Sequence, residues 1–209
     1  MTIIKKICSI ICGAPCAGID KNLIEGLVIA ADRGLDYALA AGITPDIAVG
    51  DFDSAESSVP SGVECVRVSP IKDDTDTILA ANTAIEHGCD ELRFFCALGG
   101  RLDHTFANIQ VLYDLINRGI HGKLYGDNEC AYLLRNETVE IPRYDGYLSV
   151  FSYGESAVVS ESGVKYPIDR YLMKNSFPLG VSNEITAPAA IITAHEGMVI
   201  IIEVRKSVK

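Results

Sequence analysis

Short apolar runs alternate with helix-patterned segments over the first 125 residues, and this alternation constrains the fold more than any other feature. The apolar runs have the length of buried strands and cover residues 3–12, 27–31, 47–50, 64–68, 92–98 and 123–125. Helical spacing of apolar residues marks segments 35–41, 76–87 and 102–116, and glycines follow them. Because strands joined by helices pair in parallel, we predict an α/β domain: a mostly parallel, Rossmann-like sheet with flanking helices.

The pattern changes near Asn136. From there, β-rich runs at 147–153, 157–159, 189–194 and 198–204 are separated by Gly, Pro, Ser and Asn. Only residues 168–174 suggest a helical turn. We therefore predict two domains, an α/β domain over residues 1–135 and an all-β sandwich over residues 136–209.

Composition excludes several functions. The chain is 48% hydrophobic with a net charge of -10, so we expect a folded core and no nucleic-acid-binding surface, which requires a basic patch. No apolar run is long enough to span a membrane, so we expect no membrane partner. Residues 1–18 imitate a secretory signal, but the apolar stretch is short and ends in Gly13-Ala14-Pro15, which favours a strand followed by a loop.

Seven cysteines at scattered positions argue against a disulfide framework and favour a reducing, cytoplasmic location. Cys8, Cys12 and Cys16 are evenly spaced, so an iron-sulfur site is an alternative. We favour small buried residues for Cys8 and Cys12, because they lie in an apolar run.

Two acidic groups lie close together in the sequence. Asp51 and Asp53 follow the predicted strand 47–50, and residues i and i+2 of an extended chain point to the same side. Asp73, Asp74 and Asp76 form the second group. Acidic turns or a helix cap would explain either group alone. Together they predict a site for Mg²⁺, which binds carboxylate oxygens and substrate phosphates.

A glycine-rich turn, Gly99-Gly100-Arg101, connects a predicted strand to a predicted helix, and Leu102-Asp103-His104 follow it. The helix N-terminus offers free N–H groups to an anion, and Arg101 can bind phosphate oxygens with two N–H groups at once. Alternatively, Asp103 is only a helix cap and His104 a surface residue. The segment is neither a P-loop nor a dinucleotide fingerprint.

These candidates share one position in the predicted sheet. Asp32, Asp51, Asp53 and the Gly99–Arg101 turn all come directly after strands. In parallel sheets, ligands bind beyond the carboxyl ends of the strands. The sequence therefore predicts a metal-phosphate site at that edge.

The whole chain resembles the thiamine pyrophosphokinase family. The matching segments occur in the family's order: Ala31-Asp32-Arg33-Gly34, Pro45-Asp46, Gly50-Asp51-Phe52-Asp53-Ser54, Lys72-Asp73-Asp74-Thr75-Asp76, Gly99-Gly100-Arg101-Leu102-Asp103-His104 with Asn108, Gly163-Val164-Lys165-Tyr166-Pro167 and Gly180-Val181-Ser182-Asn183-Glu184. The resemblance implies transfer of a pyrophosphoryl group from ATP to thiamine with Mg²⁺, giving thiamine diphosphate and AMP. It also implies a homodimer, with thiamine bound where one subunit's α/β domain meets the other's β domain.

The resemblance and the chemistry together suggest roles for the site residues. Asp51, Asp53, Asp73 and Asp76 are expected to hold Mg²⁺, and Gly99, Gly100, Arg101, His104 and Lys72 to bind ATP. Thiamine is expected to contact Asp32, Asp103, Tyr166, Ser182 and Asn183. Either Asp32 or Asp103 could accept the hydroxyl proton.

Two departures from the family pattern stand out: Arg33 replaces a small residue, and Tyr166 must supply any ring stacking because the chain has no Trp.

Three alternatives remain at this point. An Asp-x-Asp phosphatase uses a similar strand-and-acid signature with a nucleophilic Asp, but no later Gly-Asp-x-x-x-Asp is present. A non-catalytic nucleotide-binding module would leave the second acidic group without a role. A pyrophosphokinase acting on another heterocyclic alcohol, such as a hydroxymethyl pterin, would keep the same chemistry.

Overall fold

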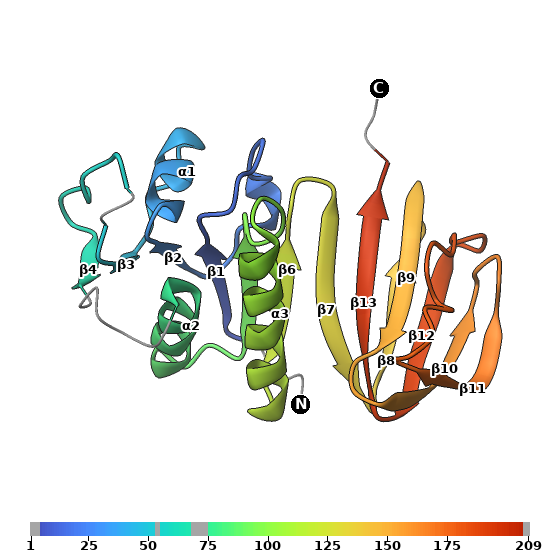
Figure 1. The fold of residues 1–209 in the computed structure, drawn as a ribbon. Coiled ribbons are helices and arrows are strands. Elements are labelled where there is room, and N and C mark those ends of the chain that lie inside the picture. Colours follow the sequence, from blue (N-terminus) through green and yellow to red (C-terminus); the bar gives the residue numbers. More distant parts are fainter. Residues whose placement is uncertain (1–4, 53–54, 68–74, 207–209) are drawn as a thin grey trace. The chain divides into compact units, whose positions relative to one another are not determined.

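The structure is a computed structural model that describes residues 5–52, 55–67 and 75–206. Its residues form two compact units, Met1–Asp127 and Asn128–Lys209. Each unit has its own layers, as the ribbon in Figure 1 shows. No helix of the described part is both long and apolar enough to cross a membrane.

The first unit contains a parallel sheet in the order β4-β3-β2-β1-β5-β6. Its strands are β1 (Ile7–Ile11), β2 (Leu27–Ala31), β3 (Ile47–Gly50), β4 (Glu64–Arg67), β5 (Glu91–Phe95) and β6 (His121–Tyr125). A short 3-10 helix, η1 (Lys21–Leu23), precedes β2. β2 and β3 have the bounds that the sequence predicts.

Among the described residues, three helices cover this sheet: α1 (Gly34–Ala40), α2 (Asp76–Glu86) and α3 (Leu102–Asn117). In Figure 1, α1 lies on one side of the sheet and α2 and α3 lie on the other. Crossovers between parallel strands are almost always right-handed, so helices change sides when the chain changes direction. Here the chain builds outward from β1 to β4, with α1 joining β2 to β3, and then returns through α2 to β5. Neighbouring β1 and β5 thus mark the position where the strand order reverses.

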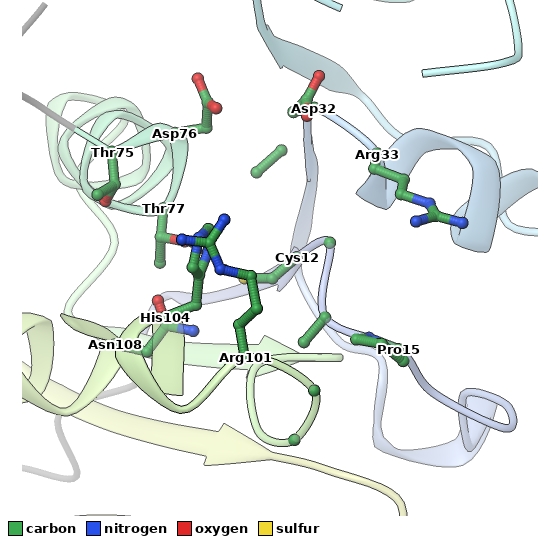
Figure 2. Close-up of a pocket in the computed structure, with 15 residues that line it drawn as sticks. Cys12, Pro15, Asp32, Arg33, Thr75, Asp76, Thr77, Arg101, His104 and Asn108 are labelled. Carbon is green, nitrogen blue, oxygen red and sulfur yellow. Dashed lines mark hydrogen bonds between the residues drawn. The ribbon is translucent and has the colours of Figure 1, made fainter. Parts of the chain in front are cut away.

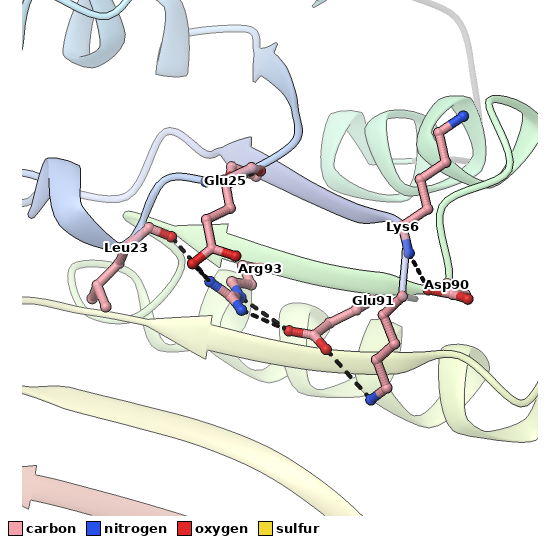
Figure 3. A network of polar contacts seen from close by, with 8 residues as sticks. Lys6, Leu23, Glu25, Asp90, Glu91 and Arg93 are labelled. Atoms are coloured by element: carbon pink, nitrogen blue, oxygen red, sulfur yellow. Dashed lines mark hydrogen bonds and ion pairs between the residues drawn. The ribbon is translucent and has the colours of Figure 1, made fainter. Parts of the chain in front are cut away.

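A polar network fastens the amino ends of these central strands (Figure 3). Arg93 on β5 donates to Glu91 at 2.9 and 3.0 Å, pairs with Glu25 and donates to the carbonyl of Leu23. Lys5 pairs with Glu91 from the other side. The network ties β5 to the segment before β2, at the end of the sheet away from the predicted site.

The second unit consists of two antiparallel sheets. One has the order β7-β13-β9, from Glu129–Arg135, Met198–Arg205 and Gly146–Ser152. The other has the order β11-β10-β12-β8, from Ile168–Lys174, Ser156–Ser162, Ala189–Glu196 and Thr138–Pro142. Leu148, Val159, Ile192 and Ile201 are fully buried between them. The predicted α/β and all-β fold classes are therefore confirmed.

One local prediction is wrong, and two strands were missed. Residues 168–174 are not a helical turn but the edge strand β11, which pairs with β10. The pairing with β10 makes this segment a strand, although its side chains are mostly exposed and show no clear period. The strands β7 and β8 were not predicted.

The structure also joins Cys16 to Cys96, so one disulfide is present where the sequence argued against a disulfide framework. Cys8 and Cys12 are buried, as predicted. Burial raises the pKa of both thiols, to about 12 for Cys12.

Candidate active site

A cavity of about 650 Å³ opens at the carboxyl ends of β1, β2 and β5. Six residues predicted for the site line it: Asp32, Asp76, Gly99, Gly100, Arg101 and His104. They come from three parts of the chain that lie far apart in sequence. The cavity sits where the strand order reverses, the usual location of ligands in such sheets.

The two acids and Arg101 occupy different walls of this cavity, and Arg33 lines it beside Asp32. In Figure 2, Asp32 and Asp76 lie at one end, while Arg101 reaches in from the turn after β5 and His104 from the start of helix α3. A ligand with several negative oxygens would meet the cationic wall, and a cation between ligand and protein would meet the acidic one.

Asp32 is held in an unusual backbone conformation directly after β2. Its φ is 46°, in the left-handed region that side chains with a Cβ seldom adopt. Its N–H donates to the carbonyl of Val49 at 2.8 Å, which fixes the residue against β3. Such strain is typical of functional positions, where the surrounding structure holds a side chain in place.

Helix α1 can start at Gly34, close behind Asp32, because this glycine allows two backbone segments to touch. A Cβ added at Gly34 would lie 1.9 Å from the carbonyl oxygen of Ile11 at the end of β1. Only glycine fits here without moving one of the two segments. This contact places Asp32 and Arg33 at the cavity.

Asp76 is positioned by the start of helix α2. Thr75 is the N-cap, and its hydroxyl accepts from the N–H of Ile78 at 3.4 Å. Asp76 then occupies the first helical turn, where the helix dipole favours a negative charge. Thr75 and Thr77 also line the cavity, and the sequence analysis missed them as site residues.

The Gly99–Arg101 turn forms the opposite wall. Gly100 has a φ of 66°, and a Cβ there would lie 2.6 Å from the ring of Pro15. Buried Asn108 donates from its side chain to the carbonyl of Ala97 at 2.8 Å and so fixes helix α3 to the end of β5. The turn therefore presents its backbone at a fixed distance from the loop after β1.

Arg101 and Asp103 form a two-point ion pair at the rim. The guanidinium donates to the two carboxylate oxygens at 3.1 and 2.6 Å. Both side chains are well exposed, at 72% and 64%. The hydrogen bonds from Arg101 and from the backbone of His104 lower the pKa of Asp103 to about 2. Asp103 does not belong to the cavity lining, unlike Arg101.

The structure describes only one of the remaining predicted metal ligands. Asp51 follows β3 and is half-buried, without lining the cavity. Asp53 and Asp73 fall outside the described residues, as does Lys72, which was predicted to bind ATP. The described part of the chain holds no group of three His, Cys, Asp or Glu residues able to hold a metal ion.

Oxygen donors suitable for Mg²⁺ are nevertheless present at the cavity. Mg²⁺ usually takes one or two protein carboxylates and completes its shell with water and substrate phosphates. The carboxylate of Asp76 supplies one such ligand at the cavity, so the residues present fit the ion.

A second cavity, of about 270 Å³, lies in the second unit. Tyr166 and Asn183, both predicted to contact thiamine, line it. Ser182, with a φ of 59°, donates from its N–H to the hydroxyl of Ser149 and is not part of the lining. Buried Glu161 lines the cavity as well and was missed, although the period of two from Ala157 and Val159 would have placed it on the buried face.

Both units match models of one protein family. Residues 23–124 match "Thiamin pyrophosphokinase, catalytic domain", and residues 136–199 match "Thiamin pyrophosphokinase, vitamin B1 binding domain". The two matches have the same order as the two compact units. The first includes Asp32 and the Gly99–Arg101 turn, and the second includes Glu161 and Asn183.

Similar proteins agree with these matches over nearly the full length. The thiamine pyrophosphokinase of Bacillus subtilis is 29% identical over an alignment 216 residues long, gaps included. The alignment covers 94% of this chain and 98% of that protein. A crystal structure of thiamine pyrophosphokinase from Bacillus subtilis superposes with a TM-score of 0.88 at 26% identity, covering 97% of this chain and 100% of that chain. The Geobacillus thermodenitrificans structure gives 0.80 at 26% identity, covering 96% and 98%. The chain belongs to the thiamin pyrophosphokinase family of enzymes.

Proposed function

We propose that the cavity of the first unit is where this chain carries out its family's reaction, the transfer of a pyrophosphoryl group from ATP to the hydroxyl of thiamine. The observation that carries the proposal is the placement of Asp32 and Asp76 opposite Arg101 and His104 in one cavity. Transfer between phosphates and alcohols depends mainly on positioning and on neutralising charge. An acidic wall facing a cationic wall suits both needs.

The acidic wall is proposed to hold Mg²⁺. Asp76 is the ligand whose position at the cavity supports this best, and Asp51, Asp53 and Asp73 remain the other proposed ligands. When bound, the ion would neutralise phosphate charge. Because Asp76 lies in the first turn of α2, phosphates held through the ion would lie near the N-terminus of this helix, where free N–H groups also favour anions.

Asp32 is proposed as the residue that orients the thiamine hydroxyl and accepts its proton. The alternative, Asp103, is held as an ionised carboxylate by Arg101, which makes it a weak base near neutral pH. Asp103 instead positions the guanidinium of Arg101. The N–H groups of Arg101 that Asp103 does not use are proposed to bind phosphate oxygens.

The thiamine ring is proposed to bind in the cavity of the second unit, beside Tyr166. We further infer a homodimer in which a complete site takes its phosphate-binding residues from one subunit and its ring-binding residues from the partner. Mixing inactive Asp76→Asn protein with an inactive Tyr166→Ala protein should then restore activity, since one site of each mixed dimer carries no substitution. Subunit exchange without recovery would contradict the shared site.

The test of the reaction is an incubation with ATP, Mg²⁺ and thiamine. AMP and thiamine diphosphate should appear together in equal amounts. Release of inorganic phosphate without AMP would favour the Asp-x-Asp phosphatase, and transfer to a hydroxymethyl pterin but not to thiamine would favour the other acceptor.

A further inference from the structure

The amide of Asn183 has no hydrogen-bonding capacity left for a ligand. Its oxygen accepts from the N–H groups of Tyr166 at 3.1 Å and Glu184 at 3.0 Å. Its nitrogen donates to the carbonyl of Tyr166 at 3.1 Å and to Glu161 at 3.3 Å. A side-chain amide offers two N–H groups and two lone pairs, and all four are used here. Asn183 therefore positions its neighbours and has no further hydrogen bond to offer a ligand in the cavity that it lines.

Glu161 is the acidic residue that Asn183 positions. It is 3% exposed and lines the second cavity, whose other lining residues are mainly apolar. On β10 it follows Ala157 and Val159 on the face that packs in the core of the sandwich. Burying a carboxyl group against apolar side chains is costly unless a partner satisfies it. Asn183 supplies one hydrogen bond, which leaves the group with further capacity towards the cavity.

We propose that Glu161, as a carboxylic acid, recognises the aminopyrimidine ring of thiamine through two hydrogen bonds. Its O–H would donate to the ring nitrogen next to the amine, and its carbonyl oxygen would accept from the amine. The same carbonyl oxygen has a second lone pair for the N–H of Asn183. The inference rests on the proposed function, because it takes thiamine as the acceptor substrate.

Three features of the cavity support this pairing. Its volume of about 270 Å³ is close to the lower end of the range for small-molecule sites and suits a single ring. Apolar residues such as Met173 and Leu179 surround the carboxyl group, as expected for a site that grips a flat heterocycle. Burial raises the pKa of Glu161 to about 7 against the smaller opposing effect of Asn183, so the acid form is available near neutral pH.

Other charged groups around Glu161 lie at the rim or on the opposite face of the sheet. Lys165 and Glu184 pair with each other at 2.8 Å in the exposed loops beside Tyr166. Asp169 and Arg170 of β11 and His195 of β12 bond to Ser160, which points away from the face of Glu161. In the other sheet, Glu203 of β13 is buried, and together with burial its charge raises the pKa of Tyr132 and Tyr144. The pKa of Glu161 responds to burial and to Asn183.

Two substitutions separate this role from a merely structural one. Glu161→Gln keeps an N–H donor and a carbonyl acceptor in the same places, so the KM for thiamine should stay within about threefold of the wild type. Glu161→Ala removes both and should raise that KM by about ten- to a hundredfold, while the KM for ATP stays unchanged. Glu140→Gln changes an exposed carboxylate of the same unit and serves as the control.

The pH profile gives the second readout. Since the acid form binds, the wild-type affinity for thiamine should fall as the pH rises above about 7. Glu161→Gln should remove this dependence, because an amide does not titrate in this range. This comparison holds even if Glu161→Ala does not fold.

The outcomes distinguish this inference from the proposed function. Calorimetric titration of thiamine into each full-length protein measures binding, and AMP release measures the reaction. An unchanged thiamine affinity in Glu161→Ala, or a Glu161→Gln protein as weak as Glu161→Ala, would overturn the role of Glu161 while AMP formation continues. Wild-type protein that neither binds thiamine nor forms AMP would overturn both.

Discussion

The two cavities hold their acidic residues in different surroundings. In the first unit, acids and bases line an open cavity and its rim, where Arg101 and Asp103 remain largely exposed. In the second unit, one carboxyl group is buried among apolar side chains and bonded to a single amide. Exposed charges of both signs suit a ligand that carries charge and metal. A buried group in an apolar cavity suits recognition of a ring by shape and hydrogen bonding.

The largest effect is expected from a substitution of Gly34, where two backbone segments beside the first cavity touch. Gly34→Ala would place a Cβ 1.9 Å from the carbonyl oxygen of Ile11, so β1 and α1 would have to separate. We expect the free energy of unfolding to fall by about 3 kcal/mol or more, which thermal unfolding would report as a lower Tm. Gly18→Ala is the matched control, because no atom lies within 4 Å of the added Cβ. Equal Tm values for the two variants would contradict the close contact.

A change of charge on the acidic wall should affect turnover more than folding. Asp76→Asn is expected to lower kcat by at least about a hundredfold, since groups that stabilise developing charge are typically worth several kcal/mol. The helix cap at Thr75 remains, so the Tm should be almost unchanged. Glu86→Gln at the exposed other end of the same helix is the control. Near-normal kcat at saturating Mg²⁺ would remove Asp76 from the metal site.

On the cationic wall, the shape of the group should matter as well as its charge. Arg101→Lys keeps the positive charge but loses the two-point pair with Asp103 and the fixed fork for phosphate. We expect kcat/KM for ATP to fall about tenfold, with thiamine binding unchanged. Arg118→Lys, at the exposed end of α3, is the control. A variant with normal ATP kinetics would show that charge alone is sufficient.

The smallest effect concerns acid stability, away from both cavities. Although burial works in the opposite direction, Arg93 and Lys5 hold the pKa of Glu91 below its ordinary value. The contribution of Glu91 is therefore present above its unfolded-state pKa and is lost as the pH falls through the folded-state pKa. Glu91→Gln should destabilise the protein by about 1 kcal/mol or less near neutrality, and the difference should vanish in acid. Urea unfolding at several pH values would measure it, and a constant difference would contradict the linkage.

The sequence predicts the first unit better than the second, for a physical reason. Buried parallel strands are continuous apolar runs between turn residues, so β2 and β3 could be predicted to the residue. The edge strand β11 exposes most of its side chains and is defined by its pairing with β10, which a single sequence does not reveal.

The candidate site shows the same limit. Asp32, Asp76 and Arg101 could be placed together because each follows a strand or begins a helix at one edge of the sheet. The pairing of Arg101 with Asp103 could not, because it depends on the side-chain conformations of two exposed residues. The complete use of the Asn183 amide likewise depends on loops that meet only in the folded unit.

The adjacency of β1 and β5 also has a consequence for the order in which the chain folds. Cys16 and Cys96, which follow these two strands, are 80 residues apart, yet the loops they belong to both line the first cavity. Contacts over such a separation form slowly, because a long stretch of chain must be ordered before they close. A nascent chain therefore cannot assemble the first cavity until β5 has been synthesised, and nucleotide binding during refolding should report the closing of the central sheet.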